Sequence, residues 1–539
     1  MSTNSVLPSA YQKSSDFFES DHHLQTILQY LLNEQANVWL TPRLKKLGYQ
    51  SANEMDELSM TADKQGPELK KRNFWGENVN EIEFHPAYKK LVKIAVDSGM
   101  LKLKWESGLK ELFRGQRNAM TFALGHLYTL GENGIYCPLC MTDGVAKIID
   151  RHGNDEMKET LLPKIAADDV KDFYTGAMYL TEKSGGSDVG ANMTKARPIG
   201  ELRYQLNGEK WFCSNANAEL ILALARTPDA KPGTRGLSIF LIEKHLENGR
   251  KNPINIIRLK DKLGVRSMAS AECKLENTLA TRIGDEGNGF KIMTEMINLS
   301  RIYNAVSAMG IARRTITEAW QYAHQRTTFG RTLISHALVR QSYATLGSRW
   351  LGLYSLMWRA IEAMDKEEQG DEKEAMLLRF LTPMVKWKTA EFTVFATRES
   401  MELMGGIGYI EDGIFPKFHR DALVLPIWEG SGNIMVLDQL RVLQKHGEEL
   451  IPLLISEFKD EEIPRLCEQL SELNMADSRD EAELKGKQFL TNLALAIQRS
   501  LLTEKPWNNI AGKTALTIFE DPFHPISKEN LDVLIGWDF

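Results

Sequence analysis

The sequence predicts a mostly helical protein with a β-domain in its middle, and three observations support this fold class. Apolar residues recur at helical spacing through the first third of the chain. Short strand-like runs replace that pattern near Phe173, and the helical period returns after Gly289. A chain of 539 residues also exceeds what one hydrophobic core supports. The predicted domains, in order, are an N-terminal helical domain over 1–172, a central β-domain over 173–281, a helical domain over 282–444 and an appended helical domain over 445–539.

The N-terminal third is expected to be helical throughout. One apolar set recurs at the spacing that lines a single helix face, and its members are Leu24, Ile27, Leu28, Leu31 and Leu32. Further helical segments are expected up to about Lys164.

The central segment contains short runs rich in β-branched and aromatic residues, separated by turn residues. These runs are YTGAMYLTE, LRYQLNGEKWF, ELILALART and LSIFLIE. Asn207-Gly208 is expected to form a hairpin turn, because this dipeptide readily adopts the backbone angles of tight hairpins.

After the β-domain, a long helix is expected to end before Phe329-Gly330. Its buried face is predicted to consist of Ile302, Ala305, Val306, Met309 and Ala312. From 445 to 539 the chain has ten Lys and Arg against eighteen Asp and Glu, a net charge of −8. The acidic run over 460–483 is interpreted as a solvated helix face or a mobile connection.

Composition excludes few functions but favours an ordinary globular enzyme. Hydrophobic residues make up 43%, charged residues 26%, and the net charge is −6, so no strong attraction to nucleic acid or anionic membranes follows. The chain shows neither a secretory signal nor a membrane-spanning apolar run, so a cytoplasmic location is expected. Five cysteines argue against a disulfide framework, and the CxxC at 137–140 is interpreted as helix packing.

Familiar nucleotide and metal motifs do not appear. There is no GxGxxG between a strand and a helix, no HExxH and no zinc-finger spacing. The sequence over 511–514 imitates the end of a phosphate loop, but Trp507 stands where its first glycine should be. The Gly/Ser-rich loop over 181–189 can present backbone N–H groups to an anion, although such a loop is more often a bare turn.

The segment IWEGSGN, over 427–433, contains the candidate catalytic base. It places the Glu429 carboxylate directly after Ile427 and the indole of Trp428, followed at once by small residues. A carboxylate held against apolar neighbours loses hydration and becomes more basic, which suits abstraction of a proton from a weak carbon acid. Most of the 72 acidic residues are solvated, so the spacing alone does not establish this role.

Six ordered segments together resemble the acyl-CoA dehydrogenases, a family of flavoenzymes, over about 130 to 442. The segments are YLTEKSGGSDVGANMTKA, GEKWFCSNANA, KLGVRSMASAECKLEN, GDEGNGFKIMTEMINLSR, AHQRTTFGRTL and MELMGGIGYIEDGIFPKFHRDALVLPIWEGSGN. The resemblance implies the fold of that family, in which an N-terminal helical domain precedes a β-barrel-like middle domain and a four-helix bundle. It also implies FAD as cofactor and an acyl-CoA as substrate.

The resemblance assigns cofactor contacts to individual residues. Leu180 and Thr181 are expected against the isoalloxazine ring and Gly186 and Ser187 at the pyrophosphate. Phe212 is expected over the ring, where the family often has Trp, with the Ser214 hydroxyl near flavin N5. Further expected cofactor contacts are Glu402, Gly405, Gly406, Trp428, Gly430, Ser431 and Asn433; at Glu402 the family usually has Gln.

Two more assignments concern the partner subunit and the substrate. Arg326 and Phe329 match residues that reach the cofactor of a neighbouring subunit, so at least a dimer is implied and a homotetramer is expected. Arg301 matches a bundle arginine near the substrate. Ser300 stands where some relatives place the base, which leaves Glu429 as the candidate. The implied reaction is removal of the α-proton by Glu429 with hydride transfer from the β-carbon to flavin N5.

The extensions at both ends and Trp428, where ordinary members often have Tyr, resemble the AidB-like branch of alkylation-response proteins. This branch implies a second hypothesis, a DNA-binding flavoprotein with weak dehydrogenase activity, which the acidic C-terminal segment disfavours. A third is that Trp428 narrows the acyl pocket so far that acyl groups are bound without turnover. An electron-transferring flavoprotein is the family's expected electron acceptor. Acyl chain length stays open.

Overall fold

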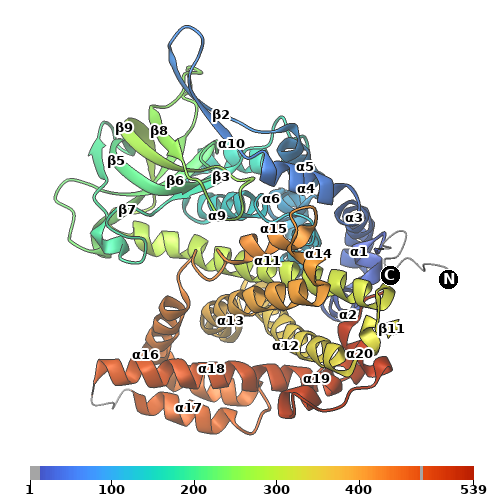
Figure 1. Ribbon diagram of the computed structural model, residues 1–539. Coiled ribbons are helices and arrows are strands. Elements are labelled where there is room, and N and C mark those ends of the chain that lie inside the picture. Colours follow the sequence, from blue (N-terminus) through green and yellow to red (C-terminus); the bar gives the residue numbers. More distant parts are fainter. Residues whose placement is uncertain (1–12, 474–477) are drawn as a thin grey trace. The chain divides into compact units, whose positions relative to one another are not determined.

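The computed structural model describes residues 13–473 and 478–539. The chain forms two compact units. The first unit consists of Met1–Asp56, Phe113–Gly131 and Asn304–Phe539, and the second of Glu57–Leu112 and Glu132–Tyr303. The element order is helices, a central β-domain and helices again (Figure 1), which confirms the predicted fold class. The four domain boundaries stay a prediction.

The second unit is built around a seven-stranded sheet. Its strands are β3 (Gly176–Tyr179), β4 (Lys195–Pro198), β5 (Arg203–Ser214), β6 (Leu220–Arg226), β7 (Leu237–Glu243), β8 (Ile254–Leu259) and β9 (Ser270–Ile283), with short 3₁₀ turns η1 (Val189–Ala191) and η2 (Thr234–Gly236). The strands are hydrogen-bonded in the order β3-β6-β4-β5-β9-β7, β8 pairs with β9, and β6 also pairs with β7. The strands from β6 to β7 therefore close on themselves, which confirms the barrel-like middle domain.

The hairpin turn predicted at Asn207-Gly208 is wrong, because both residues lie inside β5. Asn207 pairs with Glu276 of β9 and Gly208 with Leu275, and the register is irregular beside Asn207. A Cβ atom at Gly208 would lie 2.5 Å from the hydroxyl oxygen of Thr194. Glycine at this position therefore permits close approach of a neighbouring segment, not a reversal of the chain.

The first third of the chain is not helical throughout, because β1 (Glu68–Arg72) and β2 (Asn78–Glu83) form an antiparallel hairpin. Figure 1 shows this hairpin extending beyond the strands of the sheet. The Asn73 side chain accepts hydrogen bonds from the amides two and four residues further on, both at 3.0 Å, and so shapes the turn. Leu69 and Ile82 pack against the core of the sheet.

Helices accompany the sheet of the second unit. They are α4 (Glu54–Lys64), α5 (Pro86–Ser98), α6 (Met100–Trp105), α7 (Ser107–Leu112), α9 (Tyr136–His152) and α10 (Asp155–Ile165). Helix α9 packs on β3, where the hydroxyl of Thr142 accepts a hydrogen bond from the Gly176 amide at 2.9 Å. Both cysteines of the CxxC sequence, Cys137 and Cys140, lie within α9 and form no disulfide.

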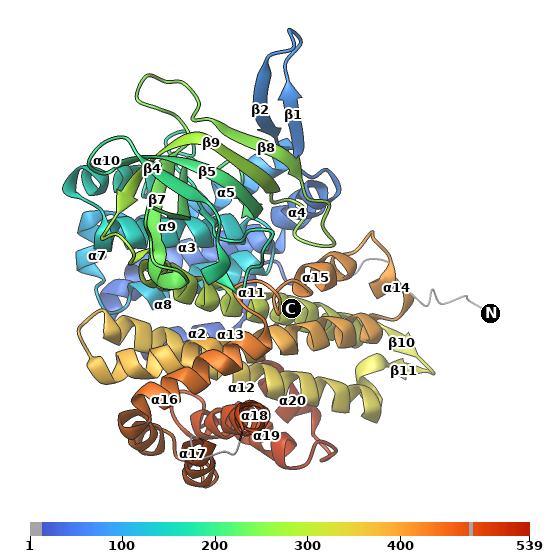
Figure 2. The ribbon, with the colours of Figure 1, turned by 90° about the vertical axis from the view of Figure 1, so that its left-hand side faces the viewer.

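In its described residues, the first unit is helical apart from one small hairpin. Its helices are α1 (Phe17–Ser20), α2 (His22–Leu31), α3 (Glu34–Ala52), α8 (Arg117–Thr129), α12 (Ala337–Glu367), α13 (Glu372–Met404), α14 (Gly406–Tyr409), α15 (Ile414–Ala422), α16 (Gly432–Glu457), α17 (Ile463–Glu472), α18 (Arg479–Thr503), α19 (Ile510–Glu520) and α20 (Lys528–Ile535), with the 3₁₀ turn η3 (Leu333–Ser335). Figure 2 shows α12 and α13 running side by side, with α16 beside α13. Helix α16 continues through residue 445, the predicted start of the appended domain.

Helix α11 (Gly289–Gln325) is the long helix that the sequence predicted, and it contributes to both units. Its five predicted face residues, from Ile302 to Ala312, are buried. In the described part of the chain, no helix is long and apolar enough to cross a membrane.

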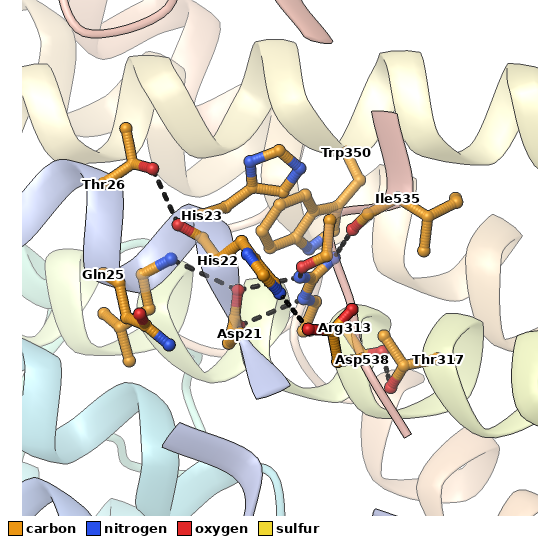
Figure 3. Close-up of polar contacts among 12 residues, drawn as sticks. Asp21, His22, His23, Gln25, Thr26, Arg313, Thr317, Trp350, Ile535 and Asp538 are labelled. Carbon is orange, nitrogen blue, oxygen red and sulfur yellow. Dashed lines mark hydrogen bonds and ion pairs between the residues drawn. The ribbon is translucent and has the colours of Figure 1, made fainter. Parts of the chain in front are cut away.

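The C-terminal tail is fastened to the first helices of the chain by buried charges (Figure 3). The guanidinium of Arg313, on α11, donates to both carboxylate oxygens of Asp21 at 3.1 and 2.7 Å. It also donates to the carbonyls of Ile535 at 2.6 Å and Gly536 at 2.9 Å. Burial alone would raise the pKa of Asp21, but attraction to Arg313 holds it well below its ordinary value.

Candidate active site

The Gly/Ser-rich loop begins directly after β3. Leu180 and Thr181 are half-buried there, and the Thr181 carbonyl accepts a hydrogen bond from the Trp211 amide of β5 at 2.9 Å. Gly186 and Ser187 are exposed at the loop tip. The predicted ring contacts and the predicted pyrophosphate contacts therefore lie on one loop, with its root packed and its tip open to a ligand.

A buried ion pair anchors this loop. The carboxylate of Glu182 accepts hydrogen bonds from the Lys210 ammonium at 2.8 Å and from the Thr194 hydroxyl at 2.5 Å. Lys210 also donates to the side-chain oxygen of Asn192 at 2.7 Å. Burial alone would raise the pKa of Glu182, but Lys210 and the hydrogen bonds hold it below its ordinary value. The Glu182 carboxylate therefore has a structural role. Lys210 contacts both Glu182 and Asn192, and so fixes the two ends of the loop.

Phe212 and Ser214 lie on β5, beside the root of the same loop. The Phe212 ring is 53% exposed, and the ammonium of Lys260 lies 4.6 Å from its centre. The hydroxyls of Ser214 and Ser270 are 3.4 Å apart. An exposed aromatic face next to a half-buried hydroxyl suits a planar heterocycle with a hydrogen-bonding edge.

Arg301 lies in the same unit, on α11, and is buried. Its guanidinium donates to the side-chain oxygen of Asn298 at 3.0 Å.

In the first unit, a tight hairpin follows α11. Arg326 is half-buried, and its carbonyl accepts a hydrogen bond from the Leu333 amide at 2.7 Å. Strands β10 (Thr327–Thr328) and β11 (Arg331–Thr332) are joined by Phe329 and Gly330, both at positive φ, as a two-residue turn requires. Phe329 is 97% exposed, so the fold presents a large apolar ring at the tip of an ordered turn.

Glu402, Gly405 and Gly406 surround the C-terminus of α13. Glu402 is exposed and accepts a hydrogen bond from Arg398, one turn earlier, at 2.6 Å. Both glycines are exposed, and Gly405 has φ +67°. The Gln that the family usually has at this position would not form this ion pair.

Glu429 lies in the turn before α16 and is half-buried. Its backbone has φ +57°, an uncommon conformation for a residue with a side chain, and Gly430 follows at φ +105°. The Trp428 ring packs against a buried cluster that includes Phe418 and Leu425. A carboxylate held next to a packed indole is partly dehydrated, which suits a base.

The residues after Glu429, the candidate base, form the start of α16. Ser431 is the N-cap of this helix, but its side chain makes no capping hydrogen bond. Asn433 is exposed, and its side-chain oxygen accepts a hydrogen bond from Lys487 of α18 at 2.9 Å. The appended helices therefore contact the segment of the candidate base.

The buried lysines that support the Gly/Ser-rich loop and the turn of Glu429 were not predicted from the sequence. Lys386 of α13 is fully buried and donates to the carbonyl of Gly430 at 2.5 Å. The sequence did contain a signal for these buried lysines, since each stands in a largely apolar stretch. Lys386 lies within TPMVKW, and Lys210 directly precedes the strand residues WFC. No group of three or more His, Cys, Asp or Glu side chains that could hold a metal ion occurs among residues 13–473 and 478–539.

Three family models match the chain. The "Adaptive response protein AidB N-terminal domain" matches residues 8–171, the "Acyl-CoA dehydrogenase, middle domain" residues 177–278, and the "Acyl-CoA dehydrogenase, C-terminal domain" residues 287–443. Together they include every predicted site residue.

Curated and solved relatives agree with these models. "Acyl-CoA dehydrogenase family member 11" of Caenorhabditis elegans is 32% identical, covering 93% of this chain and 80% of that protein. "Putative acyl-CoA dehydrogenase AidB" of Escherichia coli is also 32% identical, covering 76% of this chain and 75% of that protein. The structure of Caenorhabditis elegans ACDH-11 in complex with C11-CoA superposes with a TM-score of 0.85 at 28% identity, covering 97% and 95% of the two chains.

Proposed function

Because this chain belongs to the acyl-CoA dehydrogenase family, we propose that it is a FAD-dependent dehydrogenase of acyl-CoA thioesters with Glu429 as its base. The observation that carries this proposal is the turn of Glu429, where a half-buried glutamate directly follows a packed tryptophan in an uncommon backbone conformation. Uncommon backbone conformations in proteins cluster at functional sites.

The residues of the chain fit a flavin cofactor. The half-exposed Phe212 ring suits stacking on an isoalloxazine, and the exposed amides of Gly186 and Ser187 suit a pyrophosphate. The indole N–H of Trp428 is buried and has no hydrogen-bond partner among the described residues, and Ser431 leaves its helix uncapped. Groups left unsatisfied in this way are what a bound polar ligand would complete.

In this proposal the Glu429 carboxylate accepts the α-proton of the acyl thioester. When bound, the flavin supplies the acceptor for the hydride that leaves the β-carbon. Trp428 limits water around the carboxylate, and the half-buried turn keeps the carboxylate aimed at one carbon atom. Arg301 is assigned to the substrate on the family pattern. The C11-CoA bound by the nematode relative favours an acyl-CoA of medium or long chain as the substrate class.

The test is anaerobic titration of the purified flavoprotein with acyl-CoAs of short, medium, long and branched chains. Bleaching of the flavin band by one class is the expected result. In Glu429→Gln, bound FAD is retained and the rate of flavin reduction falls by about a few hundredfold, the usual share of a general base. Glu449→Gln, an exposed carboxylate on α16, is the matched control and reduces flavin at the wild-type rate. Unchanged reduction in Glu429→Gln would exclude this residue as the base.

A homo-oligomer is part of the proposal. Phe329 is almost fully exposed at the tip of an ordered turn, which suits insertion into a partner subunit. We assign Arg326 and Phe329 to the cofactor of the partner, so the smallest complete enzyme is a dimer and a homotetramer is expected. Phe329→Ser should reduce bound FAD and shift the protein toward smaller species in native mass spectrometry.

The match to the AidB N-terminal domain favours a second candidate, a DNA-binding flavoprotein that protects against alkylation. DNA binding needs cations that neutralise phosphates, and the segment over 445–539 has a net charge of −8. We therefore favour the dehydrogenase. The two are distinguished by titrating duplex DNA at two salt concentrations. Salt-dependent binding without flavin bleaching by any acyl-CoA would support the second candidate.

A further inference from the structure

The turn that carries the candidate base needs support from the rest of the fold. Glu429 and Gly430 both have positive φ, and only Gly430 lacks the side chain that makes this conformation unfavourable. Such a conformation persists only where surrounding contacts fix it. The question is which contacts fix the direction of the Glu429 carboxylate.

One contact comes from a lysine inside the protein. Lys386 has no exposed surface, and its ammonium donates a hydrogen bond of 2.5 Å to the carbonyl oxygen of Gly430. Lysine is almost never fully buried, because removing an ammonium from water is unfavourable unless strong partners compensate. Hydrogen bonds from charged donors are among the stronger ones in proteins. A buried cation thus contacts the carbonyl oxygen of the residue immediately after the candidate base.

The next residue of α13 holds the same turn from beside it. A Cβ atom at Gly432 would lie 2.8 Å from the indole nitrogen of Trp387, so the backbone passes directly against this ring. The indole itself is fixed by a hydrogen bond of 2.5 Å from its nitrogen to Glu391. Consecutive residues of one rigid helix therefore contact the turn at Gly430 and Gly432, on the C-terminal side of the base.

We propose that Lys386 is a positioning residue that fixes the Glu429 carboxylate by holding the Gly430 carbonyl. The inference rests on the proposed function, in which Glu429 is the base. A small displacement of a base from its proton lowers the rate strongly, whereas substrate affinity depends on contacts elsewhere. Loss of Lys386 is therefore expected to reduce the chemical step more than binding.

The experiment compares Lys386→Met, which removes the ammonium but keeps much of the volume, with wild type. At saturating acyl-CoA, the rate of flavin reduction falls about 10- to 100-fold in the variant, while FAD content and the Kd for acyl-CoA change by less than about threefold. Lys386→Arg and Lys386→Gln, which keep N–H donors, recover part of the rate. Lys373→Met is the matched control, because Lys373 is exposed in the first turn of the same helix, and its rate is expected to stay unchanged.

A second measurement does not depend on activity. In wild type, the amide of Trp428 is hydrogen-bonded to Val424 and that of Met435 to Ser431. Hydrogen exchange of peptides over 424–436 is expected to become at least about tenfold faster in Lys386→Met and to stay unchanged in Lys373→Met. Wild-type exchange together with wild-type reduction in Lys386→Met would overturn the inference.

Failure of the proposed function gives a different pattern. If no acyl-CoA reduces the wild-type flavin, the proposed function fails. Exchange in Lys386→Met still decides whether Lys386 holds the turn, and unchanged exchange then overturns the inference by itself. If Lys386→Met does not fold, Lys386→Gln is measured in the same way, and wild-type values in both measurements overturn the inference.

Discussion

Acidification is expected to loosen the C-terminal tail through one buried histidine, His23. Its ring nitrogen Nε2 lies 2.9 Å from the carbonyl of Leu534, and Figure 3 shows His23 near Arg313 and Ile535. Burial, and then repulsion from Arg313, lower its pKa from 6.5 to about 4, despite the attraction of Asp21. The ring is therefore neutral in the closed tail but binds a proton below pH 6.5 once opening of α20 exposes it to water.

The difference between the two pKa values of His23 sets how the stability of the closed tail changes with pH. Between pH 6.5 and pH 4 the open form binds more protons than the closed form, so stability of the closed tail falls as pH falls. With one pKa of 6.5 and the other about 4, lowering the pH from 7 to 5 removes about 2 kcal/mol. A loss of this size makes the equilibrium constant for opening of the tail about 30-fold larger.

The assay is hydrogen exchange of peptides over 528–537 at pH 7 and pH 5, corrected for the intrinsic pH dependence of exchange. In wild type, protection is expected to fall about 30-fold at pH 5. His23→Gln, whose amide still donates to the Leu534 carbonyl, should remove most of this fall, because no group at that position titrates. His524→Gln, at an exposed position, should behave as wild type. Equal pH dependence in wild type and His23→Gln would refute the reasoning.

Two further predictions concern the supports of the candidate site. Lys210→Met leaves the buried Glu182 carboxylate without its cation and should lower the free energy of unfolding by about 3 to 5 kcal/mol; adding Glu182→Gln should recover part of it, and equal denaturation midpoints for wild type and Lys210→Met would contradict the anchor. Gly432→Ala forces a methyl group against Trp387 and should destabilise by about 1 to 3 kcal/mol. Gly447→Ala, on the same helix with its nearest neighbour 3.9 Å away, should not destabilise, and equal effects of the two would contradict the close packing.

The sequence predicted the order of the domains because periodicity is a local property of the chain. Leu24, Ile27 and Leu28 are buried on one face of α2, as their spacing indicated. The segment around Glu429 could also be identified from the sequence, because seven consecutive residues contain the candidate base, its indole neighbour and the small residues that follow. Its positive φ was not predicted, since no residue type at that position requires it.

The errors have a different origin, because they depend on segments that meet only in the fold. Asn207-Gly208 has the composition of a turn, yet Thr194 approaches so closely that glycine is required within a strand. The hairpin over 68–83 was missed because its strands are charged and only Leu69 and Ile82 reach the core. Local composition cannot distinguish a glycine that bends the chain from one that admits a neighbour.

The roles of the buried cations also could not be predicted from local composition, because their partners lie far away in the sequence. These cations share a common arrangement. Lys210 holds the loop with the predicted pyrophosphate contacts, Lys386 holds the turn of the candidate base, and Arg313 holds the C-terminal tail. In each case the cation lies on a regular strand or helix, and its partner lies on an irregular segment or, for Arg313, at the C-terminal end of a helix. Such a segment has few apolar contacts of its own, so a directional hydrogen bond from a rigid element is an effective way to fix it. Substitutions at the exposed loop tips should therefore alter ligand contacts without loss of stability, whereas substitutions of these three cations should weaken the segments that they hold.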